Sequence, residues 1–233
     1  TYAWRDDQTD ADLVPADGGE KAFAVVDPVF GKREQVWNFH GRGQCLQCHS
    51  AWTGYSNAFN LPQLNRDVDT PVGRRNQLVW FNEVGLMNRV GADGNDWPPY
   101  SGDDLASVPK LANPHDAATP LADRGRAYLH VNCAHCHRFG GGGTTNIDLS
   151  AFDVRKGMSP IDAVPKLGGM GLTDARVIAP GAPERSVALY RMAKFGTGRM
   201  PHIGSEIVDV NGATLVRDWL RSQSNATPSD LTE

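Results

Sequence analysis

The sequence predicts a mainly α-helical fold with irregular loops, a short N-terminal β-hairpin and two small domains. Three observations predict it. Apolar residues recur at helical spacing near the end of the chain, residues 22–39 show the pattern of a short hairpin, and a Cys-x-x-Cys-His motif occurs twice in 233 residues. Because the chain has 25 glycines and 15 prolines, we expect short elements joined by irregular backbone.

The charge and hydropathy exclude two classes of partner. The chain has 27 acidic and 23 basic residues and a formal net charge of −4, with lysine and arginine scattered along it. A phosphate backbone is bound by clustered positive charge, so we expect no nucleic-acid partner. No stretch of 18 apolar residues occurs, so we expect no membrane span.

The N-terminal half is predicted in two parts. Residues 1–20 are polar and are expected to form an extended arm. Residues 22–26 and 33–39 are expected to pair as a short hairpin. We assign residues 1–35 to this N-terminal arm and β-hairpin. A first domain follows at residues 36–118. We also predict a helix over residues 75–86 and, over residues 92–120, a Gly- and Pro-rich linker or draped loop.

The second predicted domain covers residues 119–226 and is followed by a tail at residues 227–233. We expect helices over residues 121–137, from Pro183 to Lys194, and over residues 211–222, with a flexible run at Gly140–Gly143. In the last helix, one face carries Ala213, Val216, Trp219 and Leu220. We therefore expect the first and last helices of this domain to cross, with Trp219 near their contact.

All four cysteines belong to two copies of one motif. Cys45 and Cys48 are followed by His49, and Cys133 and Cys136 by His137. This is the attachment motif of c-type haem, in which both thiols bond to the vinyl groups and the imidazole reaches the iron.

A zinc site is the first alternative, but its cysteine pairs are usually separated by roughly 15–20 residues, far fewer than separate these two. A redox-active cysteine pair or two disulfides would leave the adjacent histidines unexplained. The sequence therefore predicts two covalently bound haem c groups.

An electron-transfer haem needs a second axial ligand, usually methionine or histidine. For the haem at Cys133–His137, we predict Met200, which lies in a loop rich in glycine and followed by Pro201. Met192 is the nearest rival, but it shares a helix face with Leu189 and is expected in the core.

The sixth ligand of the first haem is left open. Met87 lies at the end of a predicted helix beside glycines that allow a turn, and it is our leading candidate. His130 is the second, and an open iron is also considered. The remaining candidates are Met158, Met170, His40 and His115.

Residues 120–223 resemble a class I cytochrome c domain, because an attachment motif, a Met-Pro loop and a terminal helix occur in that family's order. The whole chain, including Gly43-Gln44-Cys45 and Gln63-Leu64-Asn65-Arg66, resembles the two-haem cytochrome modules of bacterial secreted proteins, which are often associated with sugar dehydrogenase-like β-propellers. The resemblance implies two class I cytochrome c-like haem domains, of which the first is divergent and lacks the Met-Pro loop.

The function that follows is electron transfer without catalysis, between a donor dehydrogenase and an electron acceptor. The alternative is a two-haem peroxidase or a haem sensor, either of which would use an open first iron. Because haem is attached to cysteine outside the bacterial cytoplasm, the family implies a periplasmic or secreted protein. We also consider a calcium site at Asp93, Asp96, Asp103 and Asp104, although their spacing matches no standard calcium loop.

Overall fold

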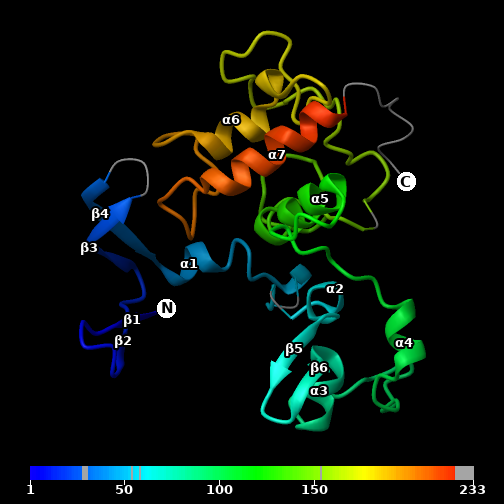
Figure 1. Ribbon diagram of the computed structural model, residues 1–233. Helices are drawn as coiled ribbons and strands as arrows, with labels where there is room; N and C mark the ends of the chain where they lie inside the picture. Colours follow the sequence, from blue (N-terminus) through cyan, green and yellow to red (C-terminus); the bar gives the residue numbers. More distant parts are fainter. Residues whose placement is uncertain (28–30, 54, 58, 153, 224–233) are drawn as a thin grey trace.

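The computed structural model describes residues 1–27, 31–53, 55–57, 59–152 and 154–223. Three antiparallel hairpins occupy the N-terminal half (Figure 1). They pair β1 (Tyr2–Trp4) with β2 (Ala11–Leu13), β3 (Gly18–Asp27) with β4 (Gly31–His40), and β5 (Asp67–Thr70) with β6 (Gly73–Asn76). None of these pairs joins another sheet among the described residues.

The hairpin predicted from residues 22–39 is confirmed, and it is longer than predicted. β3 and β4 pair along their full length, from Gly18 opposite His40 to Asp27 opposite Gly31. The turn itself, at residues 28–30, lies outside the described residues. The prediction of an extended arm over residues 1–20 is wrong, because β1 and β2 form a hairpin closed by ion pairs of Arg5 with Asp10 and Asp12.

The helices of the N-terminal half are short. They are α1 (Arg42–Cys45), the 3₁₀ turn η1 (Ala51–Thr53), α2 (Leu61–Leu64), α3 (Gln77–Glu83) and α4 (Gly102–Ser107). The helix predicted over residues 75–86 is therefore too long at both ends, because Arg75 and Asn76 pair in β6 and Asn76 caps α3 through its side chain. The predicted linker over residues 92–120 contains α4, whose capping box joins Ser101 to Asp104.

The prediction of a mainly α-helical protein is wrong. Helix accounts for 27% of the structure and strand for 18%. The physical reason lies before residue 120, where frequent glycine, proline and polar residues limit helices to a few residues and where the period-two pattern favours hairpins. The two longest helices of the described chain both lie after residue 120.

The C-terminal part contains α5 (Leu121–Asn132), the 3₁₀ turn η2 (Pro183–Arg185), α6 (Val187–Ala193) and α7 (Val210–Ser222) (Figure 1). The helix predicted over residues 121–137 ends earlier, at Asn132, and the one predicted from Pro183 to Lys194 is divided between η2 and α6. The last helix agrees with its prediction to within one residue at its start.

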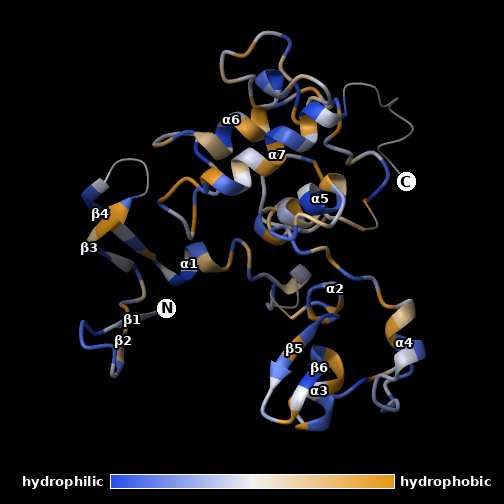
Figure 2. Ribbon diagram, viewed as in Figure 1, coloured by the Kyte–Doolittle hydropathy of each residue, from blue (hydrophilic) through white to orange (hydrophobic). Residues whose placement is uncertain are grey.

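The main hydrophobic core lies in this C-terminal part. Each of α5, α6 and α7 carries both apolar and polar residues, so that one side can be buried and another face water (Figure 2). α5 and α7 cross, with Trp219 buried at their contact as predicted, and Met192 is buried in the core as predicted. The core residues are Tyr128, Leu129, Ala134, Ile147, Leu149, Val177, Ile178, Met192, Leu215, Val216, Trp219 and Leu220. Before residue 120, the buried apolar residues of the described chain are only Val14, Leu64 and Leu78.

Candidate haem-attachment sites

The two cysteine motifs adopt the same local backbone structure. In the first, the His49 amide donates to the Cys45 carbonyl at 2.9 Å, and in the second the His137 amide donates to the Cys133 carbonyl at 2.8 Å. Each motif is therefore a single helical turn, which follows α1 in one case and α5 in the other. This turn places both thiols and the imidazole on neighbouring positions, as covalent haem attachment requires.

The first site holds its histidine by a backbone carbonyl. His49 Nδ1 lies 2.9 Å from the carbonyl oxygen of Tyr55, so a ring protonated at Nδ1 donates to that oxygen and leaves Nε2 as the free base. Tyr55 has a φ of +61°, a left-handed conformation that is uncommon for residues other than glycine. The strained backbone at Tyr55 therefore accompanies the contact that orients the His49 ring.

The carbonyl of Cys48 is also hydrogen-bonded, although no regular helix continues beyond it. The Thr53 hydroxyl donates to it at 3.0 Å and the Asn57 side-chain amide at 3.1 Å. The first attachment turn is thus closed by residues that follow it in the chain.

The second site is more deeply buried. His137 Nδ1 is buried and has no hydrogen-bond partner within the described chain. A Cβ atom at Gly143 would lie 2.7 Å from this nitrogen, so the glycine allows the backbone to lie directly against the ring. Burial lowers the pKa of His137, and Arg191, His135 and His202 lower it further. A neutral imidazole is the form that binds a metal.

The structure brings the two motifs together. Cys48 and Cys136, the second cysteines of the two motifs, are joined by a disulfide with their Cα atoms 5.5 Å apart, whereas Cys45 and Cys133 are free and partly buried. The ligand atoms of Cys48, His135 and Cys136 lie within 4.8 Å of one another. Burial raises the pKa of the Cys133 thiol to about 12.

The glycine run after the second motif lies against the first motif. A Cβ atom at Gly142 would be 1.8 Å from the Gln47 carbonyl oxygen, and one at Gly140 would be 2.9 Å from Trp52. Trp52 and Phe139 meet edge to face, with ring centroids 5.6 Å apart. The absence of side chains in the Gly140–Gly143 run permits this close packing against the first motif.

The Met200 loop also contacts the N-terminal half. The Gly204 amide donates to His40 Nε2 at 2.8 Å, and Asn38 donates to Glu206 at 3.0 Å. Met200 is half-buried, and its amide donates to the Arg191 carbonyl at 2.9 Å. Because His202 lowers the pKa of His137, this loop lies within electrostatic range of the second motif's histidine.

The candidates for the first iron are dispersed. Met87 follows α3 and is half-buried, with its carbonyl bonded to Asn82 at 2.9 Å. His130 accepts from the Ala151 amide at 3.2 Å and meets the Phe152 ring edge on. His40 Nε2 accepts a hydrogen bond from the Gly204 amide.

The other candidates lie away from a shared site. Met158 is buried, Met170 is exposed with its methyl group near Gly198, and His115 lines the cleft described below. The four aspartates considered for calcium do not gather into one group in the described part of the chain. Asp104 instead pairs with Arg89 at 2.9 Å.

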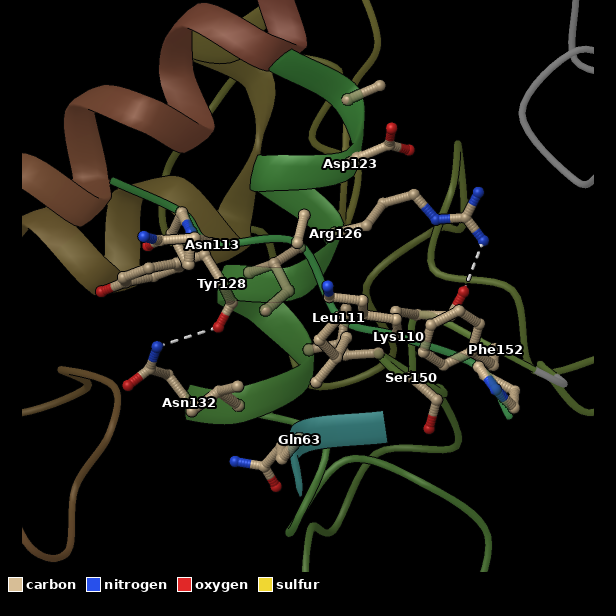
Figure 3. Close-up of a pocket in the computed structure, with 18 of the residues that line it drawn as sticks. Gln63, Lys110, Leu111, Asn113, Asp123, Arg126, Tyr128, Asn132, Ser150 and Phe152 are labelled. Carbon is tan, nitrogen blue, oxygen red and sulfur yellow. Dashed lines mark hydrogen bonds between the residues drawn. The ribbon is translucent and has the colours of Figure 1, made fainter. Parts of the chain in front are cut away.

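A wide cleft of about 2010 Å³ lies beside α5 (Figure 3). Lys110, Leu111 and Arg126 line it, and Arg126 donates to the Ala151 carbonyl at 2.9 Å. None of the four cysteines, their adjacent histidines or Met200 is among its lining residues. The attachment sites are therefore distinct from this cleft.

Residues 120–217 match the family model of the cytochrome c oxidase, cbb3-type, subunit III. This match supports a c-type cytochrome domain in this part of the chain, which would hold a covalently bound haem c with iron, and it suggests an electron carrier with redox partners. No curated protein and no solved structure matches the chain. None of the described helices has the length and apolar character needed to cross a bilayer.

The residues at Cys133–His137 fit a covalent haem. Two cysteine side chains and an imidazole form its usual donor set, and Gly143 lets the backbone pack directly against the His137 ring. The sulfur atoms of Cys48 and Cys136 can form either the disulfide with each other or one thioether bond each to haem, but not both at once. Reduction of the disulfide by a dithiol, itself oxidised to a disulfide, releases both thiols for attachment.

Sequence reasoning missed three contributors to these sites. The Tyr55 carbonyl carries no sequence signal, because any residue supplies a carbonyl. The close approach at Gly142 had a signal in the four consecutive glycines, which also occur where backbones touch. Arg199, described below, carries no sequence signal beyond its place in a Gly-rich loop.

Proposed function

We propose that the chain is a two-haem electron carrier, with one haem c at each motif and the two haems near enough to act as one relay. The observation that carries this proposal is the 5.5 Å separation of the Cys48 and Cys136 Cα atoms. In this arrangement, each of these two cysteines binds one haem through a thioether bond. Because the two cysteines are neighbours in space, the haem edges that they hold also lie close together.

Further contacts support a fixed arrangement of the two sites. Gln47 lies against Gly142, and Trp52 packs on Phe139. These contacts join residues within or just after each motif. Tight packing of this kind holds the separation of the two sites steady.

Apolar side chains around the first motif also support a haem there. Leu46, Trp52, Tyr55 and Phe59 are each more than half exposed. Few described residues of this half are buried in a core, and small domains commonly need a prosthetic group or metal for stability. A porphyrin held at Cys45 and Cys48 would cover apolar surface of this kind.

The chain's residues have separate roles in this carrier. His49 and His137 would each hold one haem iron through an imidazole nitrogen, and the Tyr55 carbonyl orients the His49 ring. Met200 is the proposed second ligand at the C-terminal haem and Met87 at the N-terminal haem. When bound, each haem supplies an iron that is reduced and reoxidised by one electron.

The partners and location follow from the same chemistry. We propose that a donor dehydrogenase, of the sugar dehydrogenase-like kind, reduces the chain and that a second protein accepts the electron. The exposed Trp52 and Phe139 beside the motifs suit a small, transient contact. Because both haems require attachment to cysteine, we propose a periplasmic or secreted location.

The test is a comparison of the holoprotein with a one-haem variant, Cys45→Ser/Cys48→Ser. We expect mass spectrometry to show two haems in the wild type and one in the variant. In a redox titration followed by EPR, we expect the C-terminal haem to change its signal and potential when the first haem is absent. A single haem in the wild type, or an identical C-terminal haem in both proteins, would refute the proposal.

A further inference from the structure

Arg199 is a buried arginine directly before the proposed ligand Met200. Only 8% of its surface is exposed. Its guanidinium donates to the Pro201 carbonyl at 2.7 Å, to the Ser205 carbonyl at 2.6 Å, to the Ser205 hydroxyl at 2.9 Å and to the Ile207 carbonyl. All these acceptors belong to the seven residues that follow Met200.

This arrangement closes the loop on one side of Met200. A guanidinium presents its donors in a rigid planar fork, so several simultaneous bonds define the path of the loop closely. A second arginine holds the other side, because Arg191 donates through Nε to the Gly198 carbonyl at 2.7 Å and its own carbonyl accepts from the Met200 amide. Met200 is thus held between two arginine-centred sets of bonds.

No carboxylate of the described residues lies within ion-pair distance of the Arg199 guanidinium. Its acceptors are carbonyl and hydroxyl oxygens, no ion pair of the described residues includes it, and its Nε is buried without a partner. The effect of this charge extends to Tyr128, whose pKa it acts to lower against the stronger effect of burial. A fixed positive charge in a poorly solvated position disfavours further positive charge nearby.

We propose that Arg199 is a positioning residue that holds Met200 toward the iron of the C-terminal haem and, through its buried charge, raises the reduction potential of that haem. This inference rests on the proposed ligation of that haem by Met200. The oxidised iron carries one more positive charge than the reduced iron, so the charge favours the reduced form. The hydrogen bonds provide the positioning, and the charge provides the effect on the potential.

Three variants separate these two effects in the holoprotein. Arg199→Gln removes the positive charge and most of the hydrogen bonds to the loop. Arg199→Lys keeps the positive charge but lacks the planar guanidinium that makes several of these hydrogen bonds at once. Ser205→Ala removes one hydroxyl partner and leaves the charge in place. Arg221→Gln is the matched control, because Arg221 is an exposed arginine in the last turn of α7.

The measurements are the sulfur-to-iron absorption at the red end of the oxidised spectrum and the potential of the C-terminal haem. We expect Arg199→Gln to lose at least half of the absorption and to lower the potential. We expect Arg199→Lys to weaken the absorption and to have a reduction potential close to that of the wild type. We expect Ser205→Ala to weaken the absorption and to leave the reduction potential unchanged. Far-UV circular dichroism and haem content select folded, loaded samples of each variant.

Met200→Ala separates failure of this inference from failure of the ligation proposal. If Met200→Ala keeps both thioether bonds but loses the absorption, Met200 is a ligand. If the absorption and potential of Arg199→Gln and Arg199→Lys then equal those of Arg221→Gln, the role of Arg199 is refuted. If Met200→Ala retains the absorption, the proposed ligation itself is refuted, and the role of Arg199 with it.

Discussion

Gly125 of α5 lies directly against the indole ring of Trp219 of α7, where an added Cβ atom would be 2.8 Å from Cδ2 of the indole. The same helix crossing contains a reciprocal pair, because a Cβ atom at Gly212 of α7 would be 2.1 Å from the ring of Tyr128 of α5. Each helix therefore offers a glycine to an aromatic side chain of the other. These two pairs set how closely the helices of the cytochrome domain approach.

Gly125→Val adds a side chain where the indole leaves no room. We expect a loss of about 1–3 kcal/mol in the free energy of unfolding, because overpacking forces the two helices apart. Chemical denaturation followed by far-UV circular dichroism measures it. Gly102→Ala is the control, since a Cβ atom at Gly102 meets nothing within 4 Å. Equal stability of Gly125→Val and wild type would mean that the crossing is not close-packed.

Tyr128→Phe tests the polar contact of the same crossing. The Tyr128 hydroxyl donates to Asp209 Oδ2 at 3.0 Å, and Asp209 also caps α7 by accepting from the Gly212 amide at 2.9 Å. At neutral pH, we expect the variant to be about 1 kcal/mol less stable than the wild type, as measured by urea denaturation.

The stability difference between the wild type and Tyr128→Phe should also depend on pH. Burial first, and then the bond to Asp209, raises the pKa of Tyr128 above its usual value of about 10. The unfolded chain therefore loses this proton first, so the contribution of Tyr128 is complete below about pH 10 and falls as the pH rises further. Urea denaturation of both proteins at pH 8 and pH 11 measures how the stability difference between them changes with pH. A difference that stays constant or grows at alkaline pH would contradict this assignment.

The haem-free chain should contain one disulfide that joins the two motifs. We expect two free thiols in the denatured, unreduced protein, from Cys45 and Cys133, and four after reduction. Thiol titration and peptide mapping measure this. Cys48→Ser should leave three free thiols, whereas Cys45→Ser should leave the disulfide intact and one free thiol. A disulfide within either motif would contradict the arrangement.

Asn65→Ala should destabilise the N-terminal half selectively. The buried Asn65 amide donates to the Leu105 and Val108 carbonyls at 3.2 and 2.8 Å, and its oxygen accepts from Asn76 at 2.9 Å. Losing these bonds leaves buried polar groups without partners, which costs about 1–3 kcal/mol. We expect faster amide hydrogen exchange in α2 and α3.

The matched control for Asn65→Ala is Asn88→Ala, at an exposed position in the same half. Exchange in α5 and α7 should stay unchanged in both variants, because these helices belong to the separate core of the C-terminal part. Equal exchange in α2 and α3 of the two variants would show that the Asn65 bonds do not hold these elements together.

The accuracy of the sequence-based predictions followed the range of the interactions involved. The hairpin at residues 18–40 and the face of α7 that contains Trp219 were predictable, because each depends on a periodic pattern of neighbouring residues. The helix content was overestimated, because the segment at residues 75–86 carries a helical stripe whose first residues pair in β6 instead. Pairing with β5 overrides the local preference there.

The sequence by itself determined the local arrangement of the two motifs, because two cysteines and a histidine within one helical turn need only local backbone bonds to take it up. Only the tertiary structure decided that Cys48 lies beside Cys136, that the Tyr55 carbonyl meets His49, and that Arg199 binds the loop after Met200. Each of these contacts depends on packing or on the path of an irregular loop, and neither leaves a periodic pattern in the sequence.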